Sequence, residues 1–114
     1  MRNVLLFGVA LAAATPAVAS DRTGYRAIAA GDYQTAEKTL LAERRIFPQR
    51  PELMINLATV YARTGRLTEA ASLYRGALAE DPVDMALPNG AVETSHAVAQ
   101  RGLDSLGPVT LAGR

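Results

Sequence analysis

Residues 54–82 read MINLATVYARTGRLTEAASLYRGALAEDP, and this stretch decides the fold. Apolar side chains recur in it at spacings of three and four residues and form two runs: Met54, Leu57, Ala58 and Tyr61, then Leu67, Ala70, Ala71, Tyr74, Ala77 and Leu78. Such spacing places each run on one face of a helix. Gly65 separates the runs, and glycine favours the left-handed conformation that ends a helix. The stretch therefore predicts two helices whose apolar faces pack together.

The same pattern occurs in weaker form thirty-four residues earlier in the chain. Three matched pairs illustrate it: Gly31 and Gly65, Ala36 and Ala70, Pro48 and Pro82. A fixed period of this length is typical of helical hairpins stacked on copies of themselves. Ala27 and Glu43 depart from the pattern, since they take the places of Tyr61 and Ala77. Two copies are fewer than such arrays usually contain, so we expect the tail or a partner to add stability.

This pattern resembles the tetratricopeptide repeat across about residues 20–84. The resemblance implies an all-α fold, with two stacked antiparallel helical hairpins of the α-solenoid type and a C-terminal capping helix. It also implies that the domain binds other proteins. We expect four segments: a signal peptide at 1–19, a first, degenerate hairpin at 20–50, a second hairpin at 51–84, and a capping helix and tail at 85–114.

Five helices are expected, at Arg22–Ala30, Tyr33–Phe47, Glu52–Thr64, Glu69–Glu80 and Val92–Leu106. Asp21, Asp32 and Thr68 are expected to cap three of them, because their side-chain oxygens can accept from free first-turn amides. Leu67, just before Thr68, is expected to pack back against that helix. In the tail, Pro88-Asn89-Gly90 predicts a turn. Gly102 is expected to weaken the last helix, whose apolar face is formed by Val92, Ser95, Ala99, Leu103 and Leu106.

The first nineteen residues have the pattern of a signal peptide. Arg2 precedes an uncharged apolar stretch at 4–14, and Ala17-Val18-Ala19 fits the rule for cleavage. The alternative, an uncleaved membrane anchor, is disfavoured because the stretch is much shorter than the roughly twenty residues that span a bilayer. Cleavage between Ala19 and Ser20 would leave a periplasmic or secreted protein without a stable membrane anchor.

The composition excludes several classes of function. The chain has 12 Lys and Arg against 11 Asp and Glu, and loss of Arg2 would balance them. A neutral domain has no electrostatic reason to bind nucleic acid or an anionic membrane. There is no cysteine, which excludes disulfides and a lipid-attachment site, and His96 is the only histidine. No catalytic or phosphate-binding motif occurs. We therefore expect no enzyme, no catalytic residues, no metal and no cofactor.

Asn56 is the strongest single candidate for partner binding. In families that resemble this repeat, an asparagine at this place faces the inner groove and bonds a peptide backbone, for which its amide offers both a donor and an acceptor. Glu52, Thr59 and Arg63 on the same helix would line the groove with it. Because that face carries no core residue, Asn56→Ala is expected to leave stability almost unchanged. The alternative is a solvated asparagine on an open helix face.

Two charged groups complete the candidates. Arg44, Arg45 and Arg50 cluster near the end of the second helix, where cations complement the helix dipole. A site for an acidic partner segment is the alternative for these arginines. A matching acidic group lies at the end of the fourth helix and consists of Glu80, Asp81 and Asp84. No base or nucleophile accompanies these carboxylates, so we do not expect them to form a catalytic site.

The leading hypothesis is an adaptor in the bacterial envelope that binds an unidentified protein or peptide in the concave groove of its repeats. The alternative is a structural subunit that uses the repeats for self-association or for docking into an envelope assembly. A homo-oligomer is compatible with both. Mass measurement in solution at several concentrations would separate them, because a stable monomer argues against the structural subunit.

Overall fold

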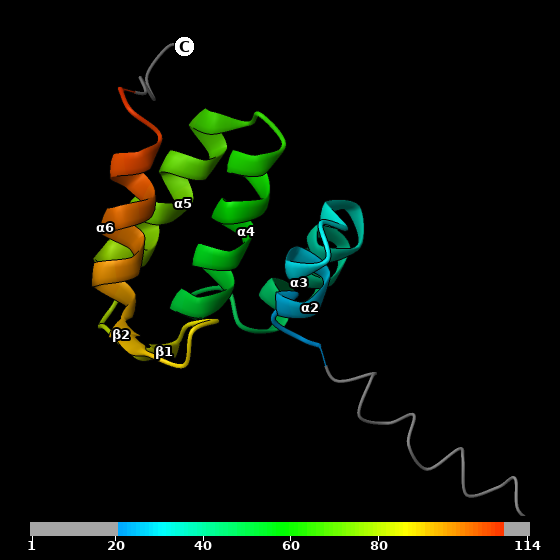
Figure 1. Ribbon diagram of the computed structural model, residues 1–114, viewed down its shortest axis with the longest axis horizontal. Coiled ribbons are helices and arrows are strands. Elements are labelled where there is room, and N and C mark those ends of the chain that lie inside the picture. The colour runs from blue at the N-terminus through cyan, green and yellow to red at the C-terminus, as the bar shows by residue number, and fades with distance from the viewer. Residues whose placement is uncertain (1–20, 109–114) are drawn as a thin grey trace, which may run out of the picture.

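The computed structural model describes residues 21–108. These residues form helices and one two-stranded sheet, in the order α2 (Tyr25–Ala29), α3 (Tyr33–Ile46), α4 (Pro51–Arg63), α5 (Leu67–Ala79), β1 (Asp84–Ala86), β2 (Val92–Thr94) and α6 (Ser95–Ser105). Helices α2 and α3 form one hairpin, α4 and α5 form a second, and α6 lies beside α5 and α4 (Figure 1). The all-α fold of two stacked hairpins with a C-terminal capping helix is confirmed. The expected signal peptide and the Ala19–Ser20 cleavage site lie outside the described residues.

Both hairpins turn in the same way, thirty-four residues apart. Gly31 has a φ of 77° and Gly65 a φ of 82°, the left-handed conformation that glycine adopts without strain. The N–H that follows each glycine donates to a carbonyl five residues earlier at 2.8 Å, from Asp32 to Ala27 and from Arg66 to Tyr61. This bond closes a helix C-terminus by satisfying one of its free carbonyls. The predicted period is thus present in the backbone.

The predicted caps are confirmed at two positions and wrong at the third. Asp32 accepts from the N–H of Thr35 at 3.2 Å. Asp21 accepts from the N–H groups of Arg26 and Ala27 at 3.2 and 3.3 Å, although the helix begins at Tyr25 and not at Arg22. The cap of α5 is Arg66, which makes no side-chain capping bond. Thr68 and Leu67 therefore lie inside α5.

Leu67 was expected to pack back against its helix, but its side chain is 42% exposed. Its place as the first residue of α5 explains this, because a residue that packs back in this way stands before the cap and not after it.

Helix α4 lies at the centre of the fold and is buried on two sides. Three of its side chains pack against α3 in one cluster, which consists of Leu53, Leu57, Val60, Ala36 and Leu40. Three others pack against α5 and α6 in a second cluster, which consists of Met54, Ile55, Ala58, Ala70, Tyr74, Ala77 and Ala99. The prediction of a single apolar face was therefore too narrow. Helix α4 needs two such faces because it has a packed neighbour on each side.

Helix α6 packs on the second cluster. Ser95 and Ala99 are buried, and Leu103 and Leu106 pack against the same cluster, as predicted. Gly102 has a packing role that the sequence did not indicate: a Cβ there would collide with the ring of Tyr74. The glycine that weakens the helix thus lets an aromatic ring lie directly on its backbone.

Val92 was expected to begin the last helix, and this is wrong. It belongs to β2 and is 62% exposed. The hairpin of β1 and β2 was not predicted, although its turn was. Gly90 has a φ of 87° and donates to the carbonyl of Leu87, while the N–H of Leu87 donates to Ala91. A type I turn followed by a left-handed glycine is a common three-residue connection between antiparallel strands.

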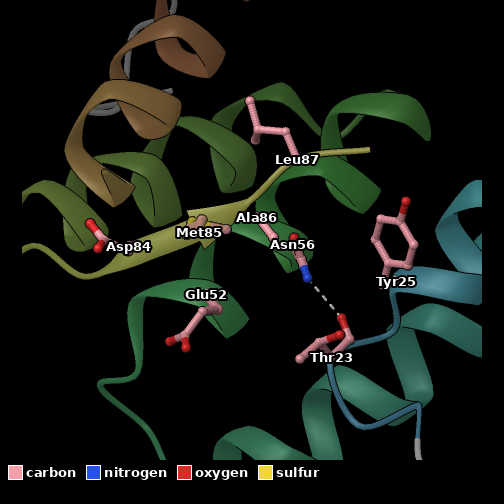
Figure 2. A pocket seen from close by; sticks show the side chains of 8 residues that line it. All are labelled: Thr23, Tyr25, Glu52, Asn56, Asp84, Met85, Ala86 and Leu87. Atoms are coloured by element: carbon pink, nitrogen blue, oxygen red, sulfur yellow. Dashed lines mark hydrogen bonds between the residues drawn. The ribbon is translucent and has the colours of Figure 1, made fainter. Parts of the chain in front are cut away.

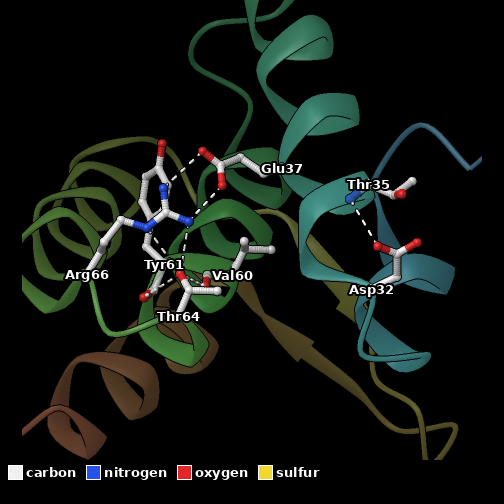
Figure 3. A network of polar contacts seen from close by, with 7 residues as sticks. All are labelled: Asp32, Thr35, Glu37, Val60, Tyr61, Thr64 and Arg66. Atoms are coloured by element: carbon white, nitrogen blue, oxygen red, sulfur yellow. Dashed lines mark hydrogen bonds and ion pairs between the residues drawn. The ribbon is translucent and has the colours of Figure 1, made fainter.

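An ion pair joins the two helical hairpins (Figure 3). Arg66, at the start of α5, donates to both carboxylate oxygens of Glu37 on α3 at 2.7 and 3.0 Å. The guanidinium also lies over the ring of Tyr61, 4.4 Å from its centroid, and donates to the Thr64 hydroxyl. Two parallel bonds fix the geometry of an arginine–carboxylate pair. The Arg66 hydrogen bonds lower the pKa of the Glu37 carboxyl below its usual range.

Candidate partner-binding site

A cavity of about 450 Å³ opens beside the first turns of α4 (Figure 2). Its lining residues come from three parts of the chain: Thr23 and Tyr25 at the start of α2, Glu52 and Asn56 on α4, and residues 84–87, which are β1 and the residue after it. Glu52 and Asn56 are four residues apart and therefore lie on the same side of α4. The cavity therefore lies between the two helical hairpins and the β-hairpin, and a segment bound in it would contact all three.

Asn56 holds the chain that leads into α2. Its Nδ2 donates to the main-chain carbonyl of Thr23 at 2.9 Å, as Figure 2 shows. From the sequence, this amide was expected to be free for a ligand, and Asn56→Ala was expected to leave stability almost unchanged. The structure corrects that expectation, because the substitution removes a bond between the two hairpins. The Oδ1 acceptor and the second N–H of the amide are left for a ligand.

The structure brings two of the four candidate residues on α4 to the cavity. Glu52 and Asn56 line it, whereas Thr59 and Arg63 do not. The hydroxyl of Thr59 bonds to the carbonyl of Ile55 and to the hydroxyl of Tyr74, both at 3.1 Å, so it lies between α4 and α5. Arg63 donates to the hydroxyl of Tyr33 at 3.0 Å. Partner binding by any of the four stays a prediction.

The charged residues of the cavity are both acidic. Glu52 and Asp84 line it, and no lysine or arginine does. The Oε1 atom of Glu52 is buried, and no group within residues 21–108 bonds to it. A buried carboxylate oxygen without a partner is unfavourable. Asp84 was grouped with Glu80 and Asp81 from the sequence, and the path of the β-hairpin brings it to the cavity that Glu52 also lines.

Two of the clustered arginines have partners within the first hairpin. Arg44 donates to the carbonyl of Pro48 at 3.0 Å. The Arg50 guanidinium lies over the ring of Phe47, 3.9 Å from its centroid. These contacts give Arg44 and Arg50 a structural role, although within residues 21–108 the buried Nε of Arg44 has no partner.

His96 bridges two helices: its Nε2 lies 2.7 Å from the carbonyl oxygen of Glu80, at the end of α5. Within residues 21–108, no three His, Cys, Asp or Glu side chains come close enough together to hold a metal ion. None of the helices in the described part of the chain has the length and apolar character to cross a bilayer.

Residues 22–84 match the family model of the tetratricopeptide repeat, which covers both helical hairpins and reaches the start of β1. No curated protein matches the chain, and no solved structure does. Tetratricopeptide repeats generally mediate protein–protein interactions. On the family match and on the two stacked hairpins of equal period, this chain belongs to the tetratricopeptide repeat family.

Proposed function

We propose that this protein is an adaptor of the bacterial envelope that binds a peptide or protein segment on the groove side of its repeats. The observation that carries the proposal is the cavity formed by α2, α4 and β1. Asn56 already bonds a main-chain carbonyl there, that of Thr23. The same amide chemistry can hold the backbone of another chain.

Site-specific photocrosslinking tests this function. Tyr25 lines the cavity and is 47% exposed, so a benzoylphenylalanine in its place keeps an aromatic side chain at the site. Ser72 is exposed on α5 and provides the matched control. Irradiation of intact cells should give a discrete adduct from position 25 and none from position 72. No adduct from position 25, or the same adduct from both, would remove the cavity as the binding site.

Once a partner is captured, Asn56→Ala provides a quantitative test. The substitution removes one acceptor from the site, and a net hydrogen bond of about 0.5–1.5 kcal/mol corresponds to an affinity loss of roughly two- to tenfold. Titration of the partner against both proteins measures this loss. Unchanged affinity would exclude Asn56 from the site.

Export is the second part of the proposal. The charge of Arg2, the apolar stretch at 4–14 and the Ala17-Val18-Ala19 sequence support it. The native protein should have Ser20 as its first residue when it is isolated from the periplasm or the medium and sequenced from its N-terminus. A membrane-bound form that still begins with Met1 would contradict export with cleavage.

A structural subunit is the second candidate, and two exposed side chains favour it. Leu41 and Ile46 on α3 are 41% and 64% exposed. Apolar side chains on an outer hairpin can serve self-association. If they do, Ile46→Lys should lower the mass measured by light scattering at high protein concentration. A monomer at every concentration would reject this candidate.

A further inference from the structure

The outer edge of β1 is open. The N–H of Leu87 donates to Ala91 at 2.8 Å, and the N–H of Ser95 donates to Val83 at 2.7 Å. Since hydrogen-bonded pairs alternate along an antiparallel ladder, the N–H and C=O groups of Asp84 and Ala86 point away from β2. Within residues 21–108, no other group bonds to them. A strand edge of this kind is a template for another extended chain.

The cavity lies along this edge. Residues 84–87, which are β1 and the residue after it, line the cavity, and no residue of β2 does. Figure 2 shows the strand running past Asn56, with Tyr25 and Thr23 on the opposite side of the opening. An extended segment placed there would have the strand edge on one side and the start of α2 on the other.

The charged residues that line the cavity indicate which kind of segment it would bind. Both charged lining residues, Glu52 and Asp84, are carboxylates, and the buried Oε1 of Glu52 has no partner in the described part of the chain. A lysine or arginine side chain on the bound segment would complement this negative charge, first of all at the exposed Asp84. Hydrogen bonds that involve a charged group are also roughly twice as strong as neutral ones.

We propose that the cavity binds an extended, positively charged segment of a partner protein, which adds to β1 as a third strand and directs a basic side chain toward Glu52 and Asp84. This inference rests on the proposed adaptor function and specifies the chemistry of its ligand. Main-chain bonds to Asp84 and Ala86 would provide affinity, and the two carboxylates would provide the preference for a basic segment.

Two fluorescent octapeptides test the inference: one of alternating lysine and valine, and one of alternating glutamate and valine. Ala86→Pro removes an N–H that points out of the sheet, and proline is tolerated at such edge positions. Val92→Pro is the matched control, because Val92 lies directly opposite Ala86 in the ladder and its N–H points to the other edge. Circular dichroism verifies that both variants keep the helical content of the parent protein.

Fluorescence anisotropy should show binding of the lysine peptide and much weaker binding of the glutamate peptide. Ala86→Pro should lower the affinity for the lysine peptide by about tenfold, because the variant loses a main-chain hydrogen bond and places a proline ring at the interface. Val92→Pro should change the affinity for the lysine peptide by less than about twofold relative to the parent protein. Methylation of alternate peptide nitrogens on the lysine probe should abolish binding to the unaltered protein, which tests strand addition even if a proline variant does not fold.

Three results would overturn the inference. They are no binding of the lysine peptide, equal binding of the two peptides, and an affinity that neither Ala86→Pro nor nitrogen methylation changes. The proposed adaptor function would survive any of these if crosslinking at position 25 captures a partner. Failure of that crosslink, with the peptide results intact, would count against the cavity as the partner site in cells, while the β1 edge would still be shown to accept an extended basic segment.

Discussion

The two helical hairpins share one sequence period but differ in how much of each is buried. Seven residues of α4 and four of α5 are buried, whereas α3 has two and α2 has none. The second hairpin has packed helices on both sides, while within residues 21–108 the first has them on one side only (Figure 1). In repeat proteins, stability depends on the interfaces between neighbours as well as on each repeat. Position in the stack, together with sequence, therefore decides how firmly a repeat is packed.

The largest effect is expected at a position that the two hairpins fill differently. Leu57 is 1% exposed, and the residue thirty-four places earlier is the exposed Thr23. Leu57→Ala should lower the free energy of unfolding by about 2–5 kcal/mol, because it leaves a cavity between α3 and α4. Thr23→Ala should change it by less than about 0.5 kcal/mol. Urea titrations of both variants measure the difference, and equal effects would show that the hairpins are packed alike.

Overpacking the crossing of α4 and α5 should have the next largest effect. Ala70 is fully buried, whereas Ala79 on the same helix is exposed. Ala70→Leu should destabilise the protein by about 1–3 kcal/mol, because the crossing has no room for a larger side chain. Ala79→Leu should be nearly neutral in the same titration. A comparable loss from both substitutions would contradict the assignment of the repeated face.

The contribution of α6 to the second hairpin can be tested at a glycine. Gly102→Ala improves helix propensity by about 1 kcal/mol but brings a methyl group into the ring of Tyr74, at an overpacking penalty of about 1–3 kcal/mol. We expect net destabilisation, measured as a lower melting temperature. Gly76→Ala is the control, since its Cβ meets only the flexible end of Met54. It should be neutral or stabilising, and the same result at Gly102 would mean that α6 packs loosely.

The smallest effect concerns the ion pair between the hairpins. The pKa of Glu37 is lowered from its ordinary value of 4.5 by its hydrogen bonds to Arg66. A lowered pKa in the folded state means that the pair stabilises the protein above about pH 4.5 and that this contribution is lost as the pH falls through the folded-state value. Glu37→Gln should therefore be less stable than the parent at pH 7, with the gap closing below pH 4.5. Urea titrations at several pH values measure it, and a gap independent of pH would exclude this role.

Local features of the fold were predictable because each depends on residues within a turn or two. Gly31 and Gly65 end their helices as expected, since a left-handed residue is needed there. The turn at Pro88-Asn89-Gly90 was predicted for the same reason, but its strands are only three residues long. Such short strands give a weak periodic signal. The sequence therefore suggested a helix from Val92, where the chain is still in β2.

The sequence by itself determined the family, the helical period and the residues that end each helix, because all of these follow from neighbours along the chain. Only the tertiary structure decided which side chains α4 buries on each side, that Asn56 bonds to Thr23, and that Asp84 and Glu52 line one cavity. The physical reason is that these contacts join separate segments of the chain, which are 33 residues apart for Asn56 and Thr23. Their geometry depends on how the hairpins stack, and one-dimensional spacing does not encode it.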